Sequence, residues 1–132
     1  MKKVKIAVLV SGSGTNLQSI LDKAESGWLP VEVACVISDR EKAYGLERAR
    51  THGVPAYFVD RRRYALREEH EEAIMAILKK HDVELLVLAG YMRLITSRMI
   101  GPYRNRIINI HPALLPSFPG TDGYGDAWRY GV

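Results

Sequence analysis

The chain has 132 residues, of which 47% are hydrophobic and 26% are charged, which is the length and apolar supply of one compact domain. It contains no run of about eighteen apolar residues and no basic-then-apolar leader. We therefore expect a cytoplasmic protein with neither a membrane-spanning helix nor a signal peptide.

A single cysteine, Cys35, excludes an intramolecular disulfide and a cysteine-based metal site. Because Cys35 lies inside an apolar run, we predict a small buried side chain rather than a nucleophile.

The net charge is mildly positive, at +4 with a pI of about 9.3, and it suits anionic ligands in general. The basic residues are densest at 61–63, where three arginines precede Tyr64. No further basic or aromatic residues interleave with this run, so we interpret it as a solvated loop and expect no nucleic-acid partner and no membrane partner.

Short β-rich apolar runs alternate with amphipathic helical patterns, which is typical of a parallel sheet covered by helices. Strands are predicted over 4–10, 31–38, 55–59, 84–88 and 106–110, and helices over 16–25, 43–52, 65–80 and near 96–100, with another starting in 125–130. Pro55 places the third strand at an edge. The pattern predicts an α/β fold with a Rossmann-like, mostly parallel sheet and helices on both faces.

The first glycine-rich segment, 11–16, joins a predicted strand directly to a predicted helix. Its glycines let backbone N–H groups approach an anion, and the helix dipole favours negative charge there. The segment lacks the lysine of a P-loop and the spacing of G-x-G-x-x-G, so it favours a single phosphate monoester over ATP or NAD. The alternative is a tight turn capped by Thr15 or Asn16.

The segment 89–95 follows the fourth predicted strand and mixes apolar side chains with one arginine, as the wall of a pocket for a flat heterocycle does. The alternative places Met92 and Leu94 in the core and Arg93 in solvent. This segment alone does not decide between the two.

The exit of the fifth strand places Asn109 and His111 on one side, because side chains of a strand alternate with a period of two. An amide donor beside an imidazole suits attack of an amine on an acyl carbon, which needs a donor for the oxyanion and a group that carries the proton. The alternative is a hydrogen-bonded structural histidine at a strand end. We interpret the remaining histidines, His52, His70 and His81, as structural.

Four motifs together resemble the glycinamide ribonucleotide transformylase family, in order and over nearly the whole chain. They are Ser-Gly-Ser-Gly-Thr-Asn-Leu at 11–17, Tyr-Gly-Leu-Glu-Arg-Ala at 44–49, Leu-Ala-Gly-Tyr-Met-Arg at 88–93 and Asn-Ile-His-Pro-Ala-Leu-Leu-Pro-Ser-Phe-Pro-Gly at 109–120. The resemblance implies the formyltransferase fold. It also implies transfer of a formyl group from 10-formyltetrahydrofolate, as co-substrate, to the amine of glycinamide ribonucleotide in de novo purine biosynthesis, without a metal.

The resemblance also assigns roles to residues of this chain. Residues for the phosphoribosyl part of the substrate would be Gly14, Thr15 and Asn16, and residues for the folate would be Arg67, Met92, Arg93, Leu94, Ile95 and Asn109. Asn109 would also stabilise the oxyanion, and His111 would transfer the proton of the attacking amine.

The family's domain continues past position 132, so the resemblance implies that residues 1–132 form about the first two thirds of a single domain, with its C-terminal strands missing. The family's catalytic aspartate, which raises the pKa of the histidine and whose loop holds the pterin, would lie beyond them. We therefore expect impaired turnover by this chain alone, and self-association through the open edge of the strand at 106–110. Asp122 stands where the family usually has a histidine, and it adds a negative charge close to the site.

Two kinds of alternative function stay open. Methionyl-tRNA formyltransferase and formyltetrahydrofolate deformylase share the Asn-x-His strand end, but the phosphate loop argues against both, and a tRNA enzyme would also need a further basic domain. From a different class, the chain would be a non-catalytic phosphate-binding module or subunit that keeps the loop at 12–16.

Overall fold

The computed structural model describes residues 2–92 and 95–110 of the chain. Five strands form one sheet in the order β3-β2-β1-β4-β5, and every neighbouring pair is parallel. The strands are β1 (Val4–Val10), β2 (Val31–Ser38), β3 (Ala56–Phe58), β4 (Leu85–Ala89) and β5 (Ile107–Ile110). The predicted parallel α/β fold is confirmed.

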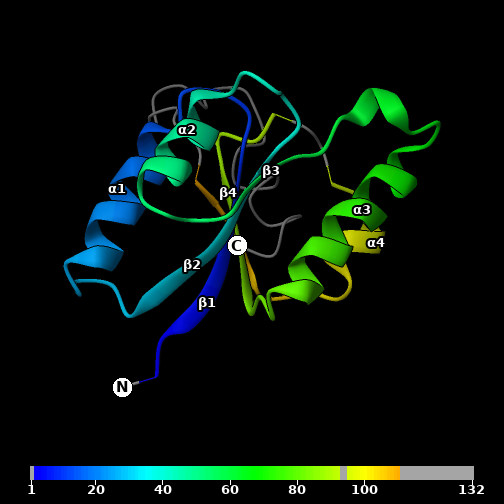
Figure 1. Cartoon of the computed structure of the whole chain (residues 1–132). Coiled ribbons are helices and arrows are strands. Elements are labelled where there is room, and N and C mark those ends of the chain that lie inside the picture. The colour runs from blue at the N-terminus through cyan, green and yellow to red at the C-terminus, as the bar shows by residue number, and fades with distance from the viewer. Residues whose placement is uncertain (1, 93–94, 111–132) are drawn as a thin grey trace, which may run out of the picture.

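Helices cover both faces of this sheet. They are α1 (Thr15–Glu25), α2 (Tyr44–Thr51), the short 3-10 helix η1 (Arg61–Arg63), α3 (Arg67–Lys80) and α4 (Ser97–Ile100). Figure 1 shows α1 and α2 together on one side of the sheet, and α3 with α4 on the other. The strand order reverses between β1 and β4, and ligands of such sheets bind beyond the carboxyl ends of the strands at that point.

The core consists of two apolar layers, one on each face of the sheet. Val8 of β1 packs in the layer that contains Leu17 and Leu46, whereas its neighbour Leu9 packs in the layer that contains Ile74. Successive side chains of a strand point to opposite faces. Because both faces are covered, residues 6–10 of β1 and all of β4 are continuous apolar runs without polar alternation.

Most predicted elements are present with small shifts at their ends. The edge position of β3 is confirmed within the described sheet, and β3 is shorter than predicted. The arginines at 61–63 are exposed as expected, but they form η1 rather than a loop, and α3 therefore starts at Arg67 instead of 65. The strand predicted at 84–88 is shifted by one residue, to Leu85–Ala89, and the side chain of Glu84 just before it accepts the N–H of Lys5 at 3.0 Å. The helix predicted at 125–130 lies outside the described residues.

Cys35 is fully buried, as predicted, and burial raises the pKa of its thiol from 9.0 to about 12. His52 and His81 end α2 and α3. His70 is buried, and its Nε2 lies 2.9 Å from the carbonyl oxygen of Val59. These positions agree with structural roles for the three histidines. No helix within 2–92 and 95–110 is both long and apolar enough to cross a membrane.

Candidate ligand-binding site

The glycine-rich loop after β1 lies against the first turn of α2. Gly14 has a φ of 75°, a left-handed conformation that side chains disfavour, and a Cβ there would lie 2.7 Å from the Cα of Gly45. The N–H of Gly45 donates to the carbonyl of Gly12 at 3.2 Å. The close approach of the two segments therefore requires glycine at 14, and a Cβ at Gly45 would lie 2.8 Å from Cγ2 of Val10.

Arg48 of α2 also holds this loop. Its Nε donates to the carbonyl of Ser13 at 2.7 Å, and one terminal nitrogen donates to Oε1 of Gln18 at 3.0 Å. The guanidinium thus ties the loop and α1 to α2. The backbone of the loop is fixed before any ligand arrives, which lowers the entropic cost of binding.

The N-terminus of α1 has no side-chain cap among the described residues. The capping position is taken by Gly14, so the alternative expectation of a turn capped by Thr15 or Asn16 is wrong in that detail. The N–H groups of the first helical turn have no partner within an α-helix, and the helix dipole places partial positive charge at this end. An anion is the group that such a helix end favours.

Ser11 links the glycine-rich loop to two other loops at the same edge of the sheet. Its Oγ donates to Oδ1 of Asp39 at 2.8 Å, and it accepts the backbone N–H of Met92 at 2.9 Å. Ser11 and Asp39 are 3% and 8% exposed, so the bond between them is shielded from water, whereas the bond to Met92 is partly buried. The ends of β1, β2 and β4 therefore meet at one hydroxyl group.

A cavity of about 220 Å³ lies at this junction. Its lining comes from the loops after β1 and β4 and from one arginine that follows β2: Ser11, Gly12, Ser13, Gly14, Thr15, Asn16, Arg40, Ala89, Gly90 and Met92. The sequence-based site residues Gly14, Thr15, Asn16 and Met92 are thus brought together. Met92 is 73% exposed, so this side chain is not part of the core.

The other expected site residues do not line this cavity as far as the structure describes them. Ile95 is 8% exposed and packs in the hydrophobic layer beneath α3, and Arg67 is an exposed residue at the start of α3. Arg93, Leu94, His111 and Asp122 lie outside the described residues. Sequence reasoning missed Ser11, Asp39 and Arg40, although each follows directly or closely upon a predicted strand.

Asn109 lies on β5, next to the central part of the sheet. It is in register with Leu88 of β4, which is in register with Leu9 of β1. By strand alternation it shares a face with Ile107, which packs in the layer that contains Ile74. Asn109 is half-buried, as an amide near a binding site commonly is.

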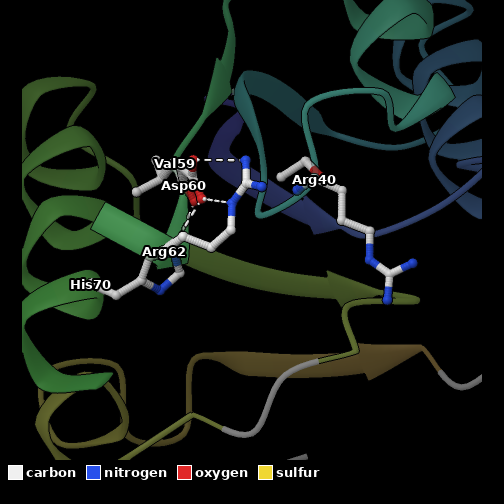
Figure 2. Close-up of polar contacts among 6 residues, drawn as sticks. Arg40, Val59, Asp60, Arg62 and His70 are labelled. Atoms are coloured by element: carbon white, nitrogen blue, oxygen red, sulfur yellow. Dashed lines mark hydrogen bonds and ion pairs between the residues drawn. The ribbon is translucent and has the colours of Figure 1, made fainter. Parts of the chain in front are cut away.

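A second polar cluster follows β3 (Figure 2). Two nitrogens of the Arg62 side chain contact the carboxylate of Asp60, with Nε–Oδ1 at 3.0 Å, and the backbone N–H of Arg62 donates to Oδ1 at 2.9 Å. The Arg62 guanidinium and N–H lower the pKa of the Asp60 carboxyl. The Arg40 side chain extends away from this pair and lines the cavity instead.

A larger cavity, of about 650 Å³, lies near the amino ends of β4 and β5, between the end of α3 and residues 102–106. In parallel sheets the binding crevice lies at the opposite, carboxyl edge, which favours the smaller cavity as the candidate site.

Over the part of the chain that the structure describes, no three His, Cys, Asp or Glu side chains gather as metal ligands would.

The similarity of this chain to known proteins extends over nearly all of its residues. A sequence profile of the formyl transferase family matches residues 4–132. A curated phosphoribosylglycinamide formyltransferase from Haemophilus influenzae is 43% identical over 96% of this chain and 60% of its own length. One from Bacillus subtilis is 40% identical over 97% of this chain and 66% of its own length.

The fold is similar as well. The crystal structure of glycinamide ribonucleotide transformylase 1 from Symbiobacterium toebii superposes with a TM-score of 0.84 at 50% identity, covering 98% of this chain and 61% of that one. This chain thus spans 60% to 66% of the length of these three relatives. On its profile, its sequence and its fold, the chain belongs to the formyl transferase family and is similar to its phosphoribosylglycinamide formyltransferases.

Proposed function

We propose that this chain transfers a formyl group from 10-formyltetrahydrofolate to the amine of glycinamide ribonucleotide, a step of de novo purine biosynthesis. One observation carries the proposal: a single cavity brings the glycine-rich loop after β1 together with the loop after β4. These are the two segments that a phosphate-bearing amine and a folate would need to share. The partners would accordingly be small molecules in the cytoplasm.

The phosphate would bind at the start of α1. Gly14, Thr15 and Asn16 offer backbone N–H groups at an uncapped helix end of the described structure, and the loop is already held by Arg48. Arg40 lines the same cavity and adds positive charge. A monoester of phosphate fits this arrangement, because its charge is compact and its oxygens accept several N–H groups at once.

The folate would bind along the loop after β4. Met92, Arg93, Leu94 and Ile95 would line its ring pocket, Arg67 would face its carboxylates, and Asn109 would touch it from β5. The exposed side chain of Met92 supports this assignment, because an apolar residue that lies outside the core is available to a flat ring.

The reaction itself would use β5 and the residue pair at its exit. The amine nitrogen attacks the formyl carbon and forms a tetrahedral intermediate with a negative oxygen. Asn109 would donate a hydrogen bond to that oxygen, and His111 would take the proton from the attacking amine. Collapse of the intermediate breaks the carbon–nitrogen bond to the folate, and the departing folate nitrogen takes up the proton that His111 removed from the amine. The products are tetrahydrofolate and formylglycinamide ribonucleotide, and His111 is neutral again.

Formation of formylglycinamide ribonucleotide by this chain tests the proposal, with Asn109→Ala and His111→Ala as loss-of-function variants. Transfer that falls by about a hundredfold or more in either variant supports the assigned roles. Ser26→Ala is the matched control, because within the described residues that exposed hydroxyl donates to the carbonyl of Lys23 at the end of α1, away from the cavity. Because turnover by this chain alone is expected to be impaired, the assay is repeated with the C-terminal part of the family's domain supplied as a separate fragment. Binding of glycinamide ribonucleotide without any transfer, even with that fragment present, would favour a non-catalytic phosphate-binding module instead.

A further inference from the structure

We propose that Ser11, oriented by Asp39, is a positioning residue that holds the wall formed by Met92 at a fixed place against the glycine-rich loop. The inference rests on the proposed function, since it concerns the site where phosphate and folate would meet. It adds two residues that neither contact the reacting atoms in that scheme nor belong to the substrate-binding set.

The geometry around Ser11 leaves its hydroxyl one arrangement. A hydroxyl has one proton, and the Ser11 proton is directed to Oδ1 of Asp39 at 2.8 Å. A lone pair of the same oxygen is then aimed at the N–H of Met92, which lies at 2.9 Å. The carboxylate fixes the direction of the hydroxyl, and the hydroxyl fixes the backbone of Met92.

Burial makes this chain of bonds strong. Ser11 is 3% exposed and Asp39 is 8% exposed, so water does not compete for either group. A bond to a charged acceptor is roughly twice as strong as a neutral one. The loss of the hydroxyl would leave the buried Asp39 carboxylate with one partner fewer, and it would remove the acceptor of the partly buried Met92 N–H.

The position of the connection gives it functional weight. Ser11 and Met92 both line the 220 Å³ cavity, one in the loop after β1 and the other in the loop after β4. Met92 is the first residue of the segment that the folate would contact, and Ser11 is the first residue of the glycine-rich loop whose residues 14–16 the phosphate would contact. A shift between the two loops would therefore misplace both substrates relative to each other.

The first test is the hydrogen exchange of the Met92 amide in the ligand-free chain, measured residue by residue by NMR. Exchange should accelerate about tenfold in Ser11→Ala and in Asp39→Leu, since each removes a bond that holds this N–H or its acceptor. The double variant should accelerate no further, because Asp39 acts through Ser11. Asp39→Asn keeps an oxygen acceptor and should stay close to wild type.

The matched control is Ser19→Ala, which removes an exposed hydroxyl of α1 that accepts a hydrogen bond from Lys23 in the part of the chain that the structure describes. It should leave the Met92 amide unchanged. Unchanged exchange in Ser11→Ala, or fully additive effects in the double variant, would overturn the connection from Asp39 through Ser11 to Met92.

The second test is calorimetric binding of glycinamide ribonucleotide and of tetrahydrofolate, well below the unfolding temperature. Ser11→Ala and Asp39→Leu should weaken both ligands by about tenfold, and Asp39→Asn should restore most of the affinity. Lower stability with unchanged affinities would reduce Ser11 to a structural residue and overturn the positioning role. A wild-type chain that binds neither ligand would contradict the proposed function, while the exchange pattern would still decide whether the connection exists.

Discussion

The carboxylate of Glu71 on α3 accepts hydrogen bonds from both the backbone N–H of Thr96, at 2.8 Å, and the hydroxyl of the same residue. Thr96 is also the residue that caps α4, through its contact with the N–H of Arg98. Glu71 is 2% exposed. The segment after β4 is therefore held at both ends, by Ser11 at Met92 and by Glu71 at Thr96.

Glu71→Leu should lower the free energy of unfolding by about 1–3 kcal/mol, because it leaves the half-buried N–H and hydroxyl of Thr96 without their acceptor. Chemical denaturation monitored by circular dichroism measures this loss. The neighbouring Glu72→Leu is the control. Glu72 pairs with Arg98 on the surface, and such pairs contribute about 0–1 kcal/mol. Equal effects at the two positions would contradict the holding role of Glu71.

Gly14→Ala should be strongly disruptive, because it places a side chain at a φ of 75° and a Cβ 2.7 Å from the backbone of Gly45. The left-handed conformation alone costs a side chain about 1–3 kcal/mol, and the clash would force the loop away from α2. We expect lower stability and loss of glycinamide ribonucleotide binding, measured by denaturation and calorimetry. Gly12→Ala, where the space is open, should change stability by less than about 1 kcal/mol.

The sequence predicted the fold well because apolar periodicity depends mainly on which face a residue buries. The strands β1 and β4 are covered on both faces, and the unbroken apolar runs at 6–10 and 85–89 indicate this directly. The proline before β3 indicated an edge strand, and β3 lies at one edge of the described sheet. The start of α3 was wrong by two residues because the turn of η1 and the extended Leu66 precede it.

The polar connections could not be predicted from periodicity. Glu71 resembles one more surface acid of α3, yet it is buried because Thr96, 25 positions away, supplies its partners. Ser11 and Asp39 are 28 positions apart, and only the pairing of β1 with β2 brings them together. Their one signal in the sequence is that each directly follows a strand, at the edge where the binding loops were expected.

The thiol of Cys35 should be unreactive in the folded chain. Burial raises its pKa to about 12, so the thiolate that attacks electrophiles is scarce at pH 8, and the side chain is fully buried. We expect no labelling by a maleimide in the native state and one label per chain in denaturant, as mass spectrometry would show. Rapid labelling of the folded chain would contradict the buried position in β2.

Stability at acidic pH should depend in part on Asp60. Its pKa is lowered by Arg62, so the folded state holds its proton less tightly than the unfolded state does. The contribution is present above the ordinary aspartate pKa of about 3.9 and is lost as the pH falls through the lower folded pKa. The free energy of unfolding should therefore fall more steeply below about pH 4 in wild type than in Asp60→Asn.

An NMR titration checks the cause of this shift. In Arg62→Gln, the pKa of the Asp60 carboxyl should move toward its ordinary value, because the guanidinium that stabilises the carboxylate is gone. The shift should not vanish, because the backbone N–H of residue 62 still donates to the carboxylate. An unchanged titration would show that the guanidinium of Arg62 does not lower the pKa of Asp60.

Calorimetry tests most directly whether the glycine-rich loop binds a phosphate. The binding of glycinamide ribonucleotide to this chain is compared with that of glycinamide riboside, which lacks only the phosphate. We expect the ribonucleotide to bind once per chain and about tenfold or more tightly than the riboside, because the start of α1 would contact the phosphate. Equal affinity of the two compounds, or no binding of the ribonucleotide, would contradict a phosphate site at the glycine-rich loop.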